Sequence, residues 1–171
     1  MAMQRGSLFG IGVETEFALP LGPETPGPCV SIKVAQVALP SVPPIMQTER
    51  LAVYSGKDEY YTFSLTNARF TLSATEIVIH ASSSVAADLL VFFAWPLLLS
   101  ILGKESLHAC VVERGGHGLA VLGTSGAGKS TTALRLIELG FRVVADDLLV
   151  FGQGFQAIPG PPFIRLRPDQ A

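Results

Sequence analysis

The sequence of 171 residues predicts an α/β protein, in which a small, mainly β region over residues 1–83 precedes a second region over residues 84–171. Three observations predict this class: short alternating segments in the first region, one amphipathic helical pattern in the second, and short apolar runs on both sides of that helix. The alternating segments, rich in Val, Ile, Tyr, Phe and Thr, are Ser31–Ala38, Glu49–Tyr54, Glu59–Leu65, Ala68–Leu72 and Glu76–His80. We expect each to be a strand, because alternation places every second side chain on one face of a sheet.

The region from residue 84 onward contains two helical patterns, each followed by a glycine. The apolar stretch Ser84–Leu102 is typical of a buried helix, and Ser130–Leu139 of an amphipathic one. The expected strands are Leu107–Glu113, Leu119–Leu122 and Phe141–Ala145. The glycine-rich link 114–118 predicts that the first two form a hairpin. Residues Leu148–Phe151 either continue the third strand or form the next one.

The composition is apolar, with 49% hydrophobic residues, 15% charged residues and a mean hydropathy of +0.44. An average soluble domain has about 25% charged residues, so three interpretations fit: an oligomer, a fragment of a larger domain, or a protein near a membrane. The apolar run Leu89–Leu102 is shorter than the ~20 residues of a spanning helix, which favours a buried helix and no membrane span. The net charge of -2 argues against a nucleic-acid-binding surface dominated by Lys and Arg.

Two features of the sequence bear on where the protein is located: its N-terminal residues and its cysteines. The N-terminal sequence MAMQRGSLFG lacks the long apolar stretch of a signal peptide. Cys29 and Cys110 make neither a disulfide framework nor a metal cluster, and we interpret both as small apolar fillers. We therefore expect a cytoplasmic protein.

Residues 123–130, GTSGAGKS, match the pattern G-x-x-x-x-G-K-[ST] of a phosphate-binding loop. Glycines let such a loop curl through positive φ, and the helix that it opens directs a partial positive charge at the phosphates. We therefore predict that the chain binds a nucleotide, with ATP and Mg²⁺ as the expected ligands. Lys129 is expected on the β- and γ-phosphates and the Ser130 hydroxyl on the metal. The alternative is a glycine turn with a surface lysine.

Asp146 and Asp147 end the apolar strand that follows the amphipathic helix. In nucleotide-binding α/β proteins, a carboxylate at this place binds the metal directly or through water. Adjacent residues of a strand point to opposite faces, so one carboxylate is expected at the metal and the other near an incoming hydroxyl. A capping pair in a turn is the alternative. His108 begins the hairpin, where sequence logic alone favours a polar residue at a strand edge.

The stretch LHACVVERGGHGLAVLGTSGAGKSTTALRLIELGFRVVADDLLVF resembles the catalytic core of HPr kinase/phosphorylase and its relatives, which include kinases of lasso-peptide precursors. The markers of the resemblance are the histidine before the hairpin, the loop GTSGAGKS, and VADD after the helix. The family has a fold similar to phosphoenolpyruvate carboxykinase, so the resemblance implies a nucleotide-binding core with a mixed sheet around the loop. Its members transfer the γ-phosphoryl group of ATP to a serine hydroxyl of a protein or peptide.

The resemblance also implies roles for individual residues. His108 falls on the family's active-site histidine, Lys129 on its phosphate-contacting lysine, and Asp147 on the carboxylate that takes the serine proton. Ser130 falls on the Mg²⁺ ligand, with Asp146 near the metal. The residues expected to bind the nucleotide are Gly123, Thr124, Ser125, Gly126, Ala127, Gly128, Lys129, Ser130 and Thr131. His-Ala in place of the usual His-Gly of HPr kinases is more similar to the peptide-kinase relatives.

The function that we expect is that of an ATP-dependent serine kinase acting on a peptide or small protein. Low charge and the resemblance both favour a homo-oligomer. One alternative is a non-catalytic nucleotide-binding module that serves regulation, and another is a small-molecule kinase or an ATPase. The family has a metal-binding glutamate and a second signature motif downstream of the aspartate pair. The sequence ends at Ala171 before any counterpart, so we expect the core to be truncated at its C-terminus.

Overall fold

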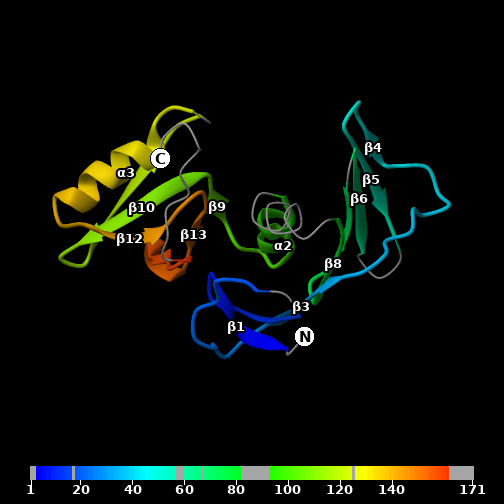
Figure 1. The fold of residues 1–171 in the computed structure, drawn as a ribbon, viewed down its shortest axis with the longest axis horizontal. Helices are drawn as coiled ribbons and strands as arrows, with labels where there is room; N and C mark the ends of the chain where they lie inside the picture. Colours follow the sequence, from blue (N-terminus) through cyan, green and yellow to red (C-terminus); the bar gives the residue numbers. More distant parts are fainter. Residues whose placement is uncertain are drawn as a thin grey trace. The chain divides into compact units, whose positions relative to one another are not determined.

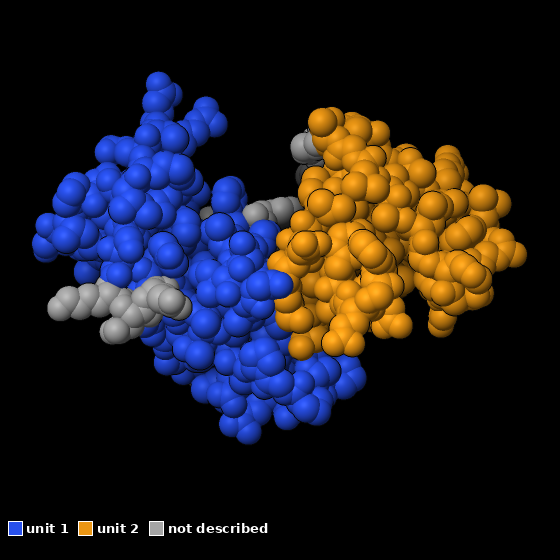
Figure 2. Space-filling model, turned by 180° about the vertical axis from the view of Figure 1, so that it is seen from behind, with its two compact units in different colours: residues 1–7, 11–103 blue, residues 8–10, 104–171 orange. Residues whose placement is uncertain are grey.

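The computed structural model describes residues 3–16, 18–56, 60–66, 68–81, 93–124 and 126–161. Contacts divide the chain into two compact units, coloured separately in Figure 2. Unit 1 comprises Met1–Ser7 and Ile11–Gly103, and unit 2 comprises Leu8–Gly10 and Lys104–Ala171. Several sheets and few helices make up the described residues, so the predicted mixed α/β class is confirmed. The boundary that we predict between residues 83 and 84 lies outside the described residues and stays a prediction.

Unit 1 contains an eight-stranded sheet with the order β1-β2-β3-β8-β7-β6-β5-β4 (Figure 1). Its strands are β1 (Gln4–Leu8), β2 (Ile11–Thr15), β3 (Cys29–Val34), β4 (Met46–Gln47), β5 (Leu51–Ser55), β6 (Tyr61–Leu65), β7 (Ala68–Leu72) and β8 (Glu76–His80). β3 pairs in parallel with β2 and β8, whereas the ladders from β8 to β4 are antiparallel. The prediction that the N-terminal region is mainly β is confirmed. β7 and β8 have the predicted bounds, because each alternates without interruption.

The core of unit 1 is built from the side chains on one face of this sheet together with a short helix. The strand residues that it buries completely or nearly so include Val30, Ile32, Phe70, Leu72, Ile77 and Ile79. Helix α2 (Trp95–Ile101) buries Trp95, Leu98 and Leu99. It is the described part of the helix predicted at Ser84–Leu102, since residues 82–92 lie outside the described residues. No helix within the described ranges is long and apolar enough to cross a membrane.

Unit 2 contains two three-stranded sheets, with the orders β11-β10-β12 and β14-β13-β9. Its elements are β9 (Ser106–Leu107), β10 (Ala109–Arg114), β11 (His117–Leu122), α3 (Lys129–Glu138), β12 (Arg142–Ala145), β13 (Leu149–Phe151), the 3₁₀ turn η2 (Gln153–Phe155) and β14 (Ala157–Ile158). The single strand predicted at Leu107–Glu113 is therefore broken at His108 into β9 and β10, which belong to different sheets. β13 is a new strand, because Asp147 has a φ of 63° and turns the chain after β12.

A two-residue turn joins β10 to β11 and confirms the predicted hairpin. Arg114 pairs with His117, and both central residues have positive φ, 62° at Gly115 and 82° at Gly116. This combination is the type I′ turn, whose twist matches that of the two strands. The Gly116 N–H donates to Oε1 of Glu113 at 2.7 Å. That hydrogen bond and the guanidinium of Arg142 lower the pKa of Glu113 from its ordinary value.

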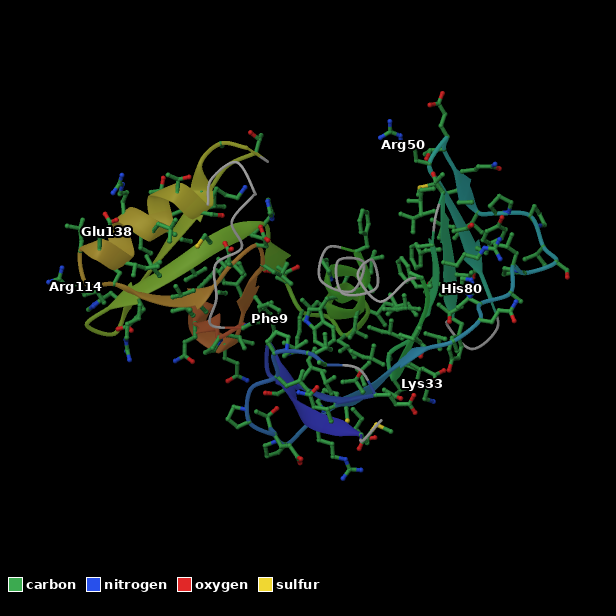
Figure 3. The ribbon with its side chains drawn as sticks, in the orientation of Figure 1. Phe9, Lys33, Arg50, His80, Arg114 and Glu138 are labelled. Atoms are coloured by element: carbon green, nitrogen blue, oxygen red, sulfur yellow. The ribbon has the colours of Figure 1, made fainter. Side chains whose placement is uncertain are left out.

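Helix α3 covers one face of the β11-β10-β12 sheet. Its residues Ala133 and Leu136 pack against Cys110, Val112 and Phe141. Arg114 holds the C-terminal end: its guanidinium donates to the Leu139 carbonyl oxygen at 3.1 Å and lies 5.6 Å from the centre of the Phe141 ring. Figure 3 labels Arg114 and Glu138 at this end of the helix. A cation here complements the negative end of the helix dipole.

Three residues from the start of the chain, Leu8–Gly10, belong to unit 2. Phe9 and Gly10, between β1 and β2, have left-handed φ values of 50° and 72°. The Phe9 side chain, labelled in Figure 3, is 5% exposed. A Cβ added at Gly160 would lie 2.5 Å from a ring carbon of Phe9, so the ring packs where another side chain would stand. The Gly160 N–H donates to the Val144 carbonyl oxygen at 2.9 Å, which places this contact beside β12.

We predict that Gly116→Ala speeds hydrogen exchange of the β10 amides about fivefold, which corresponds to about 1 kcal/mol of strain from a left-handed alanine. Gly118→Ala is the matched control, because an added Cβ meets nothing within 4 Å at either position and only Gly116 of the two has a positive φ. Equal exchange rates in the two variants would contradict the type I′ turn.

Candidate functional site

Three segments that carry predicted site residues meet at one edge of the β11-β10-β12 sheet. Ala109 at the start of β10 pairs with Leu122 at the end of β11, and Val111 pairs with Ala145 at the end of β12. Immediately beyond these positions, the chain continues into the residues His108, Gly123 and Asp146. Both described ladders of β10 are antiparallel, whereas the resemblance implies a mixed sheet. The two-residue turn accounts for the ladder between β10 and β11. β11 and β12 consequently run in the same direction, and α3 connects them (Figure 1).

The loop after β11 is shaped by its glycines. Gly126 and Gly128 have φ values of 84° and 87°, in the left-handed region that favours glycine. An added Cβ at Gly123 would lie 3.1 Å from Cβ of Ala127, so the two ends of the loop approach closely. The Ala127 N–H donates to the Thr124 carbonyl oxygen at 3.1 Å and closes the turn. Ser125 lies outside the described residues.

Helix α3 begins directly at the end of this loop. Gly128 is its N-cap residue, no side chain makes a capping hydrogen bond there, and the first turn of α3 contains no acidic residue. The positive end of the helix dipole, with its backbone N–H groups, is therefore not neutralised by a side-chain cap or an acidic residue of that first turn. Ser130 lies half-buried in this turn and Thr131 is exposed after it.

Lys129 folds back over the loop rather than extending into solvent. Its ammonium donates to the carbonyl oxygens of Gly123, at 2.9 Å, and Thr124, at 3.1 Å. Its side chain is largely buried, with a residue exposure of 8%. The only buried charge in the described residues is thus paired with backbone dipoles at the entrance to α3, which holds a cation beside the uncapped N–H groups.

His108 and Asp147 are brought together across the break between the two sheets. Nδ1 of His108 lies 2.7 Å from the backbone carbonyl oxygen of Asp147. Because a carbonyl oxygen can only accept, Nδ1 carries a proton and donates it to this hydrogen bond. Asp147 has a φ of 63°, which Asp tolerates better than most residues, and the Leu148 N–H donates to the Asp146 carbonyl oxygen at 2.8 Å. The turn between β12 and β13 is therefore fixed partly by His108.

Cys110 lies beside the predicted site. From the sequence we interpret it as an apolar filler and do not recognise its polar thiol as part of the surroundings of the site. It is fully buried on β10. Burial, together with the negative charge of Asp146 and a hydrogen bond to its side chain, raises the pKa of the Cys110 thiol to about 12, while Lys129 lowers it. The thiol is therefore protonated at neutral pH and lies near both the Asp146 carboxylate and the Lys129 ammonium. Only the pairing of β10 with its neighbouring strands shows that Cys110 lies beside the site, and the sequence pattern does not reveal that pairing.

Comparison with known proteins places a family resemblance on this part of the chain. Residues 100–160 match the HPr Serine kinase C-terminal domain. Curated relatives named HPr kinase/phosphorylase include that of Streptococcus thermophilus, 38% identical over 68 residues, or 40% of this chain and 21% of the relative. The relative from Lacticaseibacillus casei is 42% identical over 64 residues, covering 36% and 20%. The relative from Malacoplasma penetrans is 35% identical over 85 residues, covering 50% and 28%.

Residues 100–160 are related to the HPr serine kinase C-terminal domain. The resemblance predicted from the sequence is thereby confirmed for the stretch that contains β10, β11, α3 and β12. The 68 residues that align with the Streptococcus thermophilus relative span 21% of its length. The HPr-kinase-like region, residues 100–160, thus contains the loop, Lys129, His108 and the aspartate pair.

We predict that iodoacetamide at pH 8 modifies Cys29 and spares Cys110 in the folded protein. Cys29 is exposed, whereas Cys110 is buried and its pKa of about 12 leaves on the order of 10⁻⁴ of the thiol ionised at that pH. Mass spectrometry of the peptides after timed quenching measures both rates. Unfolding in guanidinium is the control, since it should equalise them; equal rates without denaturant would contradict the burial of Cys110.

Proposed function

We propose that the HPr-kinase-like region binds ATP with Mg²⁺ at residues 123–131 and transfers the γ-phosphoryl group to a serine of a peptide or small protein. The observation that carries the proposal is the meeting of the loop, Lys129, Asp146 and the His108–Asp147 pair at one edge of a sheet. The relatives named HPr kinase/phosphorylase support the same chemistry. A core of the phosphoenolpyruvate carboxykinase type, acting in the cytoplasm as a homo-oligomer, belongs to this proposal.

The triphosphate is held by charge and by backbone donors. We expect N–H groups of the loop and of the first turn of α3 to donate to the phosphates, and the helix dipole favours an anion there. The Lys129 ammonium exchanges the carbonyl oxygens of Gly123 and Thr124 for phosphate oxygens. Hydrogen bonds between two ionised groups are stronger than those to a neutral carbonyl, so this exchange favours the bound nucleotide.

The donor atoms at this edge fit Mg²⁺. Ser130 offers a hydroxyl oxygen and Asp146 a carboxylate oxygen, and Mg²⁺ commonly takes one or two protein ligands while phosphates and water complete its shell. The described residues contain no group of three or more His, Cys, Asp and Glu side chains that could hold a metal alone. When bound, the ion neutralises charge on the β- and γ-phosphates.

The acceptor serine is oriented and deprotonated by the chain's own side chains. Its hydroxyl oxygen attacks the γ-phosphorus in line with the bridging oxygen to the β-phosphate, that bond breaks, and ADP leaves with its electron pair. The Asp147 carboxylate accepts the hydroxyl proton. His108 donates from Nδ1 to the Asp147 carbonyl oxygen, which keeps the left-handed turn in place and fixes the direction of the carboxylate. Most of the rate enhancement in such a transfer comes from positioning and charge.

We expect Lys129→Ala to weaken ATP binding at least a hundredfold, because the cation that neutralises the phosphates is lost. Isothermal titration with MgATP measures the change. Arg135→Ala is the matched control: it removes another cation from α3, but one whose side chain is 75% exposed and paired with Glu138. The assignment of the loop is overturned when Lys129→Ala binds ATP as tightly as the unchanged protein.

A second variant separates binding from transfer. Asp147→Asn should leave ATP affinity within about threefold, since Asn also tolerates a left-handed φ, and should reduce transfer to serine at least a hundredfold because an amide accepts no proton. Labelled ATP with serine peptides or small proteins provides the assay. Binding by the unchanged protein without transfer would instead support the nucleotide-binding module, and phosphate release without a labelled acceptor would support an ATPase.

A further inference from the structure

Cys110 occupies an unusual place for a thiol. It is fully buried in a cluster with Val112 and Ala133, on the face of the sheet that α3 covers. It is also the second residue of β10, one position inside the edge at which the loop and the aspartate pair lie. Unlike the apolar side chains around it, the Cys110 thiol carries a hydrogen-bond donor.

Strand register brings Asp146 next to Cys110. Val111 pairs with Ala145, the last residue of β12, and the antiparallel direction of this ladder means that Asp146 and Cys110 are the next residues beyond that pair. Residues at equivalent positions of two antiparallel strands project to the same face. The face is the one that α3 covers, and Lys129 is the first residue of α3. The influence of Asp146 and Lys129 on the pKa of Cys110 agrees with this arrangement.

We propose that Cys110 is a positioning residue, whose buried S–H group donates a hydrogen bond to the Asp146 carboxylate and holds it toward the first turn of α3. This inference rests on the proposed function, in which Asp146 and Ser130 contact the metal that accompanies ATP. In this arrangement, one oxygen of the Asp146 carboxylate accepts the hydrogen bond from the thiol, and the carboxylate is thereby directed at the metal. A weak donor is effective here, because a buried environment strengthens a hydrogen bond to a charged acceptor.

The first experiment measures the Mg²⁺ dependence of ATP binding in three variants. Cys110→Val keeps an apolar side chain at this position and removes the donor, so the half-saturating Mg²⁺ concentration should rise about tenfold, the loss expected for a group that orients a metal ligand. Cys110→Ser restores a donor and should stay within about threefold of the unchanged protein. Val112→Ala is the structural control, since it perturbs the same cluster and should leave the Mg²⁺ dependence unchanged. Equal Mg²⁺ dependence in Cys110→Val and the unchanged protein overturns the proposal.

The second experiment needs no nucleotide. A double-mutant cycle in urea unfolding compares Cys110→Val, Asp146→Ala and the double variant. Direct contact predicts a coupling of about threefold or more in the unfolding equilibrium constant, whereas additive effects overturn the contact. If Cys110→Val does not fold, Cys110→Ala replaces it in the cycle. A protein that shows the coupling but binds no MgATP refutes the proposed function and retains the Cys110–Asp146 hydrogen bond, so the two failures are distinguishable.

Discussion

The register of β10 is the constraint on which the rest of unit 2 depends. The turn at Gly115 and Gly116 fixes how β10 pairs with β11, and the other edge of β10 fixes β12. Because side chains alternate, a slip of one residue would turn Cys110 and Val112 away from α3 and separate the ends of the flanking strands. One strand thereby determines the positions of the histidine before it, the loop after β11 and the aspartates after β12.

The two ends of α3 are treated in opposite ways. At the C-terminal end, Arg114 donates to a free helix carbonyl and covers the Phe141 ring, so the negative end of the dipole is compensated. At the other end, the helix begins at a glycine without a side-chain cap, and a lysine lies across the loop instead. The helix is anchored by packing and by its far end, which leaves its N–H groups available to an anion.

Local signals in the sequence were sufficient for much of the fold and for the loop. The bounds of β7 and β8, the hairpin and α3 to within one residue followed from alternation, paired glycines and a continuous motif. β1 and β2 were missed, because two strands of five residues joined by two residues resemble the irregular segment around them. The break at His108 was missed as well, since the apolar pattern continues from β9 into β10 although the sheet changes. The closeness of Cys110 to Asp146 depends on the register of β10 against β12, which no local pattern encodes.

The position of Phe9 has a consequence for how unit 2 can be separated from the rest of the chain. Unit 2 is assembled from two stretches of the chain, a tripeptide near the start and everything after Gly103. A gene segment that encodes only the later stretch would carry Gly160 without the aromatic ring that fills the space beside it. Unit 2 is therefore discontinuous in the sequence, and recombination or proteolysis that detaches the first ten residues removes part of its interior.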